Sequence, residues 1–185
     1  MPLSVIGGEF RGRRLKSPPG LVRPTAAVLR RSLFDILGAR VVGRRVLDLY
    51  AGAGTLGIEA ISRGATASEF VERDRRVASV LQANLELLGL TGPGGRGRVH
   101  CAPVETWLES NRSELGGVDL VLIDPPYGDR TLDRALATLA ETLGPGATVV
   151  VEERASRRPQ APEPLVETRY VKHGDSALTM MELRR

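Results

Sequence analysis

Short apolar runs alternate with longer amphipathic segments over residues 45–153, and this alternation constrains the fold more than any other feature. Runs such as "RVLDLY" and "ASEFVE" are rich in branched residues, which favours buried strands. Longer segments such as "DRRVASVLQANLELLGL" carry apolar residues at helical spacing. Strands that alternate with helices predict an α/β fold, with a mostly parallel sheet and helices on both of its faces.

The boundaries of these elements follow from glycine, proline and capping signals. The expected strands cover residues 45–50, 67–72, 97–101, 118–127 and 147–153. The expected helices cover residues 54–64, 74–90, 104–111 and 129–144, with Asp74 as a helix cap and Gly89 as a helix end.

The two ends of the chain depart from this pattern. Near the start, "LSVIGGEFRGRRLKSP" predicts a hairpin around Gly7 and Gly8, and "RPTAAVLRRSLFDILGAR" predicts a helix capped by Thr25 that stops near Gly38. Near the end, "LVETRYVKHGDSALTMMELR" predicts a second hairpin. We therefore expect a small extension over residues 1–43 and a core over residues 44–185.

Composition narrows the class of protein. A chain of 185 residues suits one domain, and its single cysteine, Cys101, excludes an internal disulfide and is expected to be buried. We see no apolar run that suits a signal peptide or a membrane span, so we expect a cytoplasmic protein, with a monomer as the default.

Basic residues gather in the first quarter of the chain. Residues 1–45 contain ten Lys and Arg against two acids, a balance of +8, which leaves −4 of the total +4 for the rest. A solvated basic face is one interpretation. The clustering favours a segment that faces a polyanion, with Arg11, Arg13, Arg14 and Lys16 on the expected hairpin.

A glycine motif follows the first strand of the core. Gly52, Gly54 and Gly57 match a dinucleotide fingerprint, and Glu72 stands where a carboxylate can accept both ribose hydroxyls, so a nicotinamide site is one interpretation. Asp48 argues against it, because a carboxylate there would repel a pyrophosphate but attract a ligand with an ammonium and a sulfonium.

The stretch "LVLIDPPYGD" contains the candidate catalytic residues. Pro125 and Pro126 lack backbone N–H groups, so the chain must leave the sheet there. The Pro125 carbonyl and the Asp124 carboxylate then offer two acceptors to a planar amino group, and Tyr127 offers a ring on which a base can stack. This arrangement predicts a holder for a nucleobase with an exocyclic amino group.

Such a holder suits methyl transfer. The lone pair of an aromatic amine is delocalised, and hydrogen bonds to both of its N–H groups would orient the nitrogen and stabilise its developing charge. A sulfonium donor is already activated, so most of the catalysis can be alignment. The chemistry requires no metal, and His100 and His173 lack the spacing of metal ligands.

With these motifs in view, the chain resembles the RsmD-type small-subunit ribosomal RNA methyltransferases of bacteria. The resemblance lies in "DLYAGAGTLGIEAISRGA", "FVERD" and "DPPY", together with "VIGGEFRGRRL" and "VRPT" upstream. It implies a Rossmann-like class I methyltransferase with a seven-stranded sheet whose last strands form the tail hairpin. It also implies S-adenosylmethionine as donor, and the amino group of one guanine in 16S rRNA, free or in an assembly intermediate, as acceptor.

The resemblance also implies roles for individual residues. The expected donor-binding residues are Asp48, Tyr50, Ala51, Gly52, Gly54, Thr55, Glu72, Arg73 and Val104. The expected catalytic residues are Asp124, Pro125, Pro126 and Tyr127. The expected RNA-binding residues are Arg11, Arg13, Arg14, Lys16, Arg23, Thr25 and Arg30.

Two segments depart from the family pattern. Residues 26–31 read "AAVLRR" where the family has a more polar run, and Pro103 stands where many methyltransferases have an acid that binds adenine.

Two other functions therefore stay open at this point. One is a DNA adenine amino-methyltransferase, disfavoured because no insertion is long enough for a target-recognition domain. The other is a nucleic-acid-binding module with a decayed pocket.

Overall fold

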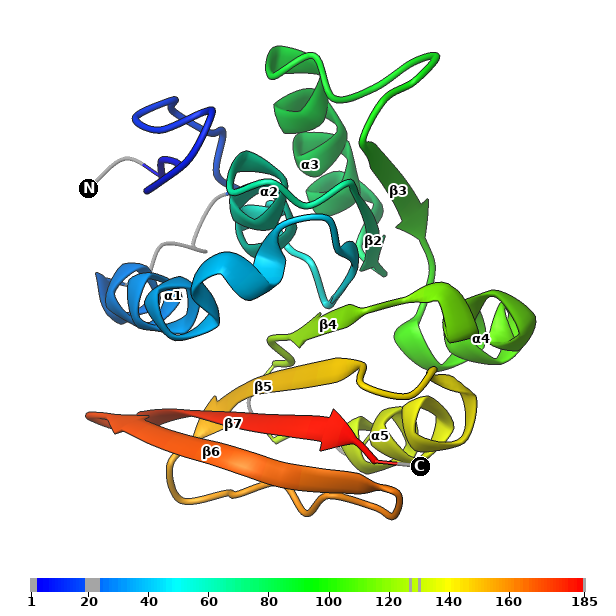
Figure 1. Cartoon of the computed structure of the whole chain (residues 1–185). Helices are drawn as coiled ribbons and strands as arrows, with labels where there is room; N and C mark the ends of the chain where they lie inside the picture. The colour runs from blue at the N-terminus through cyan, green and yellow to red at the C-terminus, as the bar shows by residue number, and fades with distance from the viewer. Residues whose placement is uncertain (1–2, 19–23, 127, 130, 185) are drawn as a thin grey trace.

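The computed structural model describes residues 3–18, 24–126, 128–129 and 131–184 (Figure 1). The strands are β1 (Arg45–Leu49), β2 (Ala67–Glu72), β3 (Gly97–Cys101), β4 (Leu120–Ile123), β5 (Thr148–Arg154), β6 (Leu165–His173) and β7 (Ser176–Leu183). The α-helices are α1 (Pro24–Leu37), α2 (Thr55–Ser62), α3 (Arg75–Leu87), α4 (Val104–Ser110) and α5 (Leu132–Thr142). Two short 3₁₀ helices are η1 (Gly38–Val41) and η2 (Arg112–Gly117).

The strands form one seven-stranded sheet in the order β3-β2-β1-β4-β5-β7-β6. The first five in this order are parallel, and β7 is antiparallel to both β5 and β6. The predicted α/β class, the parallel core and the hairpin at the tail are confirmed. Because β1 pairs with both β2 and β4, the strand order reverses at β1, and the carboxyl ends of β1 and β4 meet there.

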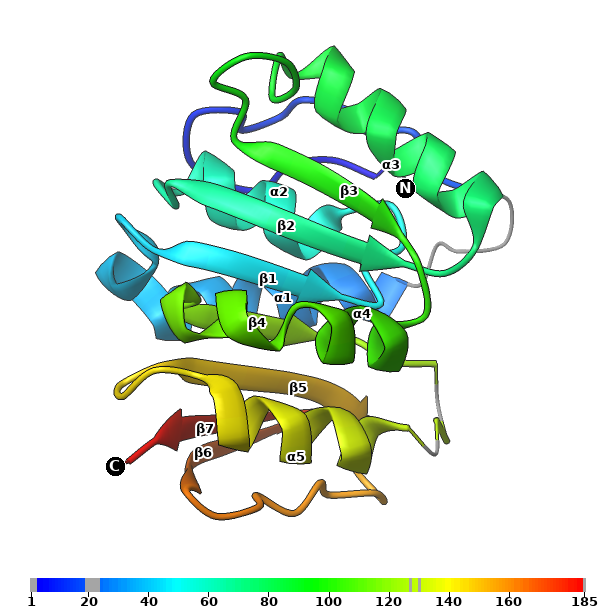
Figure 2. The same ribbon diagram turned by 90° about the vertical axis from the view of Figure 1, so that its right-hand side faces the viewer.

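Helices cover both faces of the sheet. Helices α1, α2 and α3 lie on one face and α4 and α5 on the other (Figures 1 and 2). Successive residues of β1 serve opposite faces, as expected for a strand buried on both sides. Val46 packs with α1 and α2, whereas Leu47 packs with α4 and α5. The sheet is therefore sandwiched between apolar helix faces, and its edge at the strand carboxyl ends is left for loops.

The N-terminal segment is simpler than predicted. Ser4 and Arg14 form an isolated antiparallel bridge, and the Val5 N–H donates to the Arg13 carbonyl at 3.0 Å, but no extended strands form within residues 3–18. The prediction of a hairpin was therefore right about the pairing and wrong about the strands. The structure places this segment against α2 and α3, where Val5 and Leu15 join their apolar core.

Three local predictions can be checked at helix ends and a sheet edge. Asp74 caps α3, accepting from Arg76 and Val77 N–H groups at 2.8 and 3.1 Å, as predicted. The prediction of Thr25 as a cap was wrong, because α1 already includes Pro24. Cys101 is exposed rather than buried, because it lies at the end of the edge strand β3.

Candidate active site

The two predicted motifs meet at the carboxyl ends of β1 and β4. Leu49 is in register with Ile123, and the Asp124 N–H points to the Leu49 carbonyl at 3.5 Å. Asp124 is exposed, whereas Pro125 is buried. Asp124 therefore emerges from the sheet directly beside the loop that follows Asp48.

The rest of the "DPPY" motif is placed in part. Pro126 is exposed, and its carbonyl accepts a hydrogen bond from the Asp129 N–H at 3.0 Å, which turns the chain after the two prolines. Tyr127, the predicted stacking residue, lies outside the described residues. Its role stays a prediction.

The glycine loop has the backbone shape that its sequence predicts. Gly52 and Gly54 have φ angles of 56° and 82°, in the left-handed region that favours glycine. At Gly54 an added Cβ would lie 2.1 Å from Leu81 Cδ1 on α3, so the loop also packs too tightly for a side chain. Helix α2 begins at the next residue, Thr55, and its first amides face the loop.

Asp48 lies beneath this loop rather than on the surface of the site. It is 1% exposed, and its Oδ2 accepts a hydrogen bond from the Gly57 N–H at 2.8 Å in the first turn of α2. Burial raises the pKa of the Asp48 carboxyl well above its usual range, and the charges of Asp124 and Glu72 raise it further. Three carboxylates thus influence one small region, which is suited to a cationic ligand.

Glu72 connects the end of β2 to the glycine loop. Its Oε2 accepts from the Gly52 N–H at 3.0 Å and its Oε1 accepts from the Asp74 N–H at 2.8 Å. Each carboxylate oxygen can accept a second hydrogen bond, so the half-buried Glu72 can still receive hydroxyl donors. Ala51, the residue before Gly52, is held by its own N–H, which donates to the Val71 carbonyl at 3.0 Å.

Two further predicted donor-binding residues lie at the ends of β2 and β3. Arg73 is exposed directly after β2. Val104 is 3% exposed and packs in the core, with Pro103 as the residue before α4. Its backbone N–H stands in the first turn of α4 and has no intrahelical partner.

Tyr50 links the two loops. Its φ angle is 58°, and within the described residues no other residue except glycine has a positive φ. Such a backbone conformation costs about 1–3 kcal/mol. The Tyr50 hydroxyl lies 2.9 Å from Thr131 Oγ1, and Thr131 in turn donates to Asp129 Oδ1 at 2.6 Å. Burial raises the pKa of the Tyr50 phenol to about 12. Sequence reasoning placed Tyr50 at the donor and missed Asp129 and Thr131, since nothing in their spacing indicates contact with residue 50.

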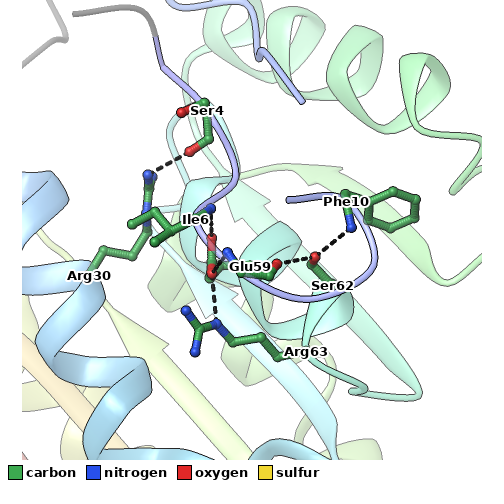
Figure 3. Close-up of polar contacts among 8 residues, drawn as sticks. Ser4, Ile6, Phe10, Arg30, Glu59, Ser62 and Arg63 are labelled. Carbon is green, nitrogen blue, oxygen red and sulfur yellow. Dashed lines mark hydrogen bonds and ion pairs between the residues drawn. The ribbon is translucent and has the colours of Figure 1, made fainter. Parts of the chain in front are cut away.

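The N-terminal segment is held by a buried carboxylate on α2. Glu59 is 0% exposed and accepts from the Ile6 and Gly7 N–H groups at 2.8 Å each, and from Arg63 Nε at 2.7 Å (Figure 3). Ser62, one turn on, accepts from the Phe10 N–H at 2.9 Å. The "IGG" motif thus fits against α2. Sequence reasoning missed Glu59 as a structural residue, although an acid inside the apolar run "LGIEAIS" was a signal.

Asn84 on α3 holds the other end of the same segment. It is 0% exposed, and its amide accepts from the Lys16 N–H at 2.7 Å and donates to the Lys16 carbonyl at 3.0 Å. It also donates to the carbonyl of Ala53, within the glycine loop, at 3.0 Å. Sequence reasoning missed this contact, which joins segments far apart in the chain.

The predicted RNA-binding residues divide into three groups. Arg11, Arg13, Arg14 and Lys16 are exposed on the N-terminal segment, as expected. Arg23 lies outside the described residues, and Thr25 lies in the first turn of α1. Arg30 faces inward instead: it is 6% exposed, burial lowers its pKa, and its Nη2 donates to the Ser4 carbonyl at 2.7 Å. This correction follows from the packing of α1 against the N-terminal segment, which Figure 3 shows.

The described part of the chain contains neither a membrane-crossing helix nor a cluster of metal ligands. No helix there has the length and apolar character that a membrane crossing needs. Within the same residues, no group of three or more His, Cys, Asp and Glu side chains is placed to hold a metal ion. His100 instead lies 2.7 Å from Glu69 Oε2, and His173 lies 3.1 Å from Ser32 Oγ.

Comparison with known proteins decides the family. The family described as "Conserved hypothetical protein 95" matches residues 3–182 of the chain. The chain belongs to this family. Its match covers both the N-terminal segment and the sheet, so the resemblance found in the sequence motifs extends over nearly the whole structure.

Two relatives and one solved structure illustrate the similarity. The "Putative rRNA methyltransferase YlbH" of Bacillus subtilis is 33% identical over 98% of this chain and 100% of its own length. The ribosomal RNA small subunit methyltransferase D of Escherichia coli is 34% identical over 81% of this chain and 74% of its own length. The solved structure "Putative methyltransferase yhhF from Escherichia coli" has a TM-score of 0.86 at 30% identity, covering 100% of this chain and 99% of that one. The predicted methyltransferase fold is confirmed.

Proposed function

We propose that this protein transfers a methyl group from S-adenosylmethionine to the exocyclic amino group of a guanine in small-subunit ribosomal RNA. The observation that carries the proposal is the exposed Asp124, which leaves β4 beside the glycine loop after β1, with its N–H 3.5 Å from the Leu49 carbonyl. The names of the relatives in Bacillus subtilis and Escherichia coli favour ribosomal RNA over DNA as the acceptor.

The donor side of the site fits the proposed cofactor. S-adenosylmethionine carries an ammonium and a sulfonium, and the mutually repelling carboxylates Asp48, Glu72 and Asp124 favour a cation between them. Glu72 retains acceptor capacity for ribose hydroxyls. The left-handed glycines Gly52 and Gly54 let the backbone approach a ligand closely.

The acceptor side supplies orientation. We expect the Asp124 carboxylate and the Pro125 carbonyl to accept the two N–H groups of the target amine, which directs its lone pair and stabilises positive charge on nitrogen. When bound, S-adenosylmethionine supplies a methyl carbon whose bond to sulfur breaks as the new bond to nitrogen forms, and sulfur leaves with that electron pair as a neutral thioether. The amine would then give up one proton, which the Asp124 carboxylate that holds it can take up.

The N-terminal segment suits RNA binding. Arg11, Arg13, Arg14 and Lys16 are exposed, while the backbone is fixed to α2 just before Arg11 by Glu59 and Ser62, and to α3 at Lys16 by Asn84. Four cations on a fixed backbone can bind phosphates without first ordering the segment. We expect a monomer that acts in the cytoplasm.

Methyl transfer to purified substrates tests the proposal. The protein would be incubated with isotopically labelled S-adenosylmethionine and either free 16S rRNA or small ribosomal subunits from an Escherichia coli strain lacking its own methyltransferase D. Digestion and mass spectrometry should find labelled N2-methylguanosine at one position. Label found instead in adenine of DNA, or in no nucleic acid while the donor still binds, would contradict the proposal and favour the DNA enzyme or the decayed binding module.

A further inference from the structure

Tyr50 and Thr131 form a direct side-chain link between the two loops of the site. Tyr50 directly follows β1 and leads into the glycine loop, whereas Thr131 directly precedes α5. Their hydroxyls lie 2.9 Å apart although the residues are 81 positions apart in sequence. The donor loop and the acceptor loop are therefore in direct contact away from the reacting groups.

The direction of these hydrogen bonds follows from the chemistry of the partners. Thr131 has one hydroxyl proton, and a carboxylate can only accept, so Thr131 Oγ1 donates to Asp129 Oδ1 at 2.6 Å. The Thr131 oxygen still has lone pairs that can accept, so Tyr50 is the donor in the 2.9 Å hydrogen bond between the two hydroxyls. Since the pKa of Tyr50 is raised to about 12, its phenol keeps this proton throughout the physiological range.

The link continues to the "DPPY" motif. The Asp129 N–H donates to the Pro126 carbonyl at 3.0 Å, and Asp129 Oδ1 also accepts from the Thr131 N–H at 2.7 Å. A continuous chain of hydrogen bonds thus runs from Tyr50 through Thr131 and Asp129 to Pro126. The left-handed backbone of Tyr50, unusual for a bulky residue, is a second and independent sign that its side chain is held in a required direction.

From this geometry we infer that Tyr50 is a positioning residue that sets the acceptor loop against the donor loop through the hydroxyl of Thr131. The inference rests on the proposed function and deepens it, because it assigns the alignment of the two reactants to a defined pair of side chains. Tyr50 was expected only at the donor. Its hydroxyl is instead directed to the acceptor side, so removing it should disturb alignment more than donor binding.

The test uses two variants that each remove one hydroxyl. Tyr50→Phe and Thr131→Val should each lower kcat by about tenfold, as expected for a small misalignment of reactants. The affinity for S-adenosylhomocysteine, measured by calorimetry, should stay within about twofold of the wild type. Because both variants break the same bond, the double variant should be no slower than either single one by more than about twofold.

Two controls separate positioning from stability. Thr131→Ser keeps the hydroxyl and should restore kcat. Tyr170 lies on β6, at the edge of the sheet far from β1, and its phenol donates to the Ala155 carbonyl at 3.3 Å. Tyr170→Phe removes this phenol and should leave kcat unchanged. Melting temperatures of all variants would show that each is folded at the assay temperature.

Amide hydrogen exchange supplies a readout that needs neither donor nor RNA. Peptides spanning residues 124–131 should exchange faster in Tyr50→Phe and Thr131→Val than in Thr131→Ser or Tyr170→Phe. The inference would be overturned if both Tyr50→Phe and Thr131→Val kept the exchange rates and the kcat of the wild type. It would also be overturned if the losses of kcat in the two single variants multiplied in the double variant. A wild-type protein that transfers no methyl group would instead overturn the proposed function, while the exchange experiment would still test the link.

Discussion

The side-chain amide of Asn84 binds both backbone polar groups of Lys16: its oxygen accepts from the Lys16 N–H at 2.7 Å and its nitrogen donates to the Lys16 carbonyl at 3.0 Å. The same nitrogen reaches the Ala53 carbonyl at 3.0 Å. A fully buried side chain on α3 therefore holds both the basic segment and the glycine loop, which are 37 positions apart from Lys16 to Ala53.

We expect Asn84→Ala to be strongly destabilising. It would remove three hydrogen bonds to the backbone, of which the one to the buried Ala53 carbonyl alone is worth about 1–3 kcal/mol, and the melting temperature falls by about 2–4 °C per kcal/mol in a chain of this size. Asn111→Ala is the matched control, because Asn111 is half-buried and donates a single bond, to the Trp107 carbonyl at 2.7 Å. Equal melting temperatures in the two variants would refute the structural role of Asn84.

Asp48→Asn should stabilise the protein at neutral pH. The pKa of Asp48 is raised in the folded state above its ordinary 3.8, so its favourable contribution is present below about pH 4 and is lost as the pH rises through the folded pKa. Asparagine keeps an acceptor for the Gly57 N–H without the buried charge. We expect the melting temperature at pH 7 to rise by at least about 2 °C, and the affinity for S-adenosylmethionine to fall.

A control of opposite sign is available at Asp74. Hydrogen bonds from the Val77 and Arg76 N–H groups lower the pKa of this exposed carboxyl, so its contribution is present above about pH 4 and is lost as the pH falls through the folded pKa. Melting curves of Asp74→Asn from pH 3 to pH 8 should therefore diverge downward from the wild type with rising pH, whereas those of Asp48→Asn diverge upward. The same sign for both variants would rule out the assigned causes.

Asp124→Ala should abolish methyl transfer while donor binding survives. Its exposed carboxylate lies at the exit of β4 and is proposed to hold the target amine, so its loss should lower kcat by about a hundredfold or more. Calorimetry with S-adenosylhomocysteine should give an affinity within about tenfold of the wild type. Full activity in the variant would remove Asp124 from the mechanism.

Replacing Arg11, Arg13 and Arg14 with Gln should weaken RNA binding and flatten its salt dependence. Each lost phosphate contact reduces the slope of log K against log salt by about 0.7–0.9. The control removes Arg112 of η2 and Arg134 of α5, the latter a helix on the face of the sheet opposite α2 and α3 (Figure 2), and should change the slope less per charge removed. An unchanged slope in the triple variant would return these arginines to an ordinary solvated surface.

A structural feature could be predicted from the sequence when the residues that form it are close together along the chain. The strands and helices of the core agree with the patterns of apolar residues to within a few positions, because burial on a sheet or a helix face leaves a local period in the sequence. Asp74 was likewise predictable, since a helix cap contacts residues two and three positions away. Thr25 failed as a cap because several residues near a helix start can serve, and local signals do not choose among them.

The less predictable residues are polar ones whose partners are distant in sequence. Arg30 looked like a residue for RNA, yet it is buried against Ser4. Glu59 was not singled out in the sequence, yet it accepts from the backbone of residues 6 and 7. Whether a charged side chain faces solvent or a buried donor depends on which segment packs over it. The sequence pattern around that residue does not indicate which distant segment this will be.

The amino-acid sequence by itself determined the α/β class, the tail hairpin and the two motifs at the ends of β1 and β4, because local periodicity, proline and glycine act within a few residues. Only the tertiary structure decided that Asp48 lies under the glycine loop and that Tyr50 reaches Thr131. It also decided that Asn84 joins Lys16 to Ala53. These contacts arise when the sheet brings distant strand ends to one edge, and buried polar groups must then find partners among whatever backbone and side chains that edge supplies.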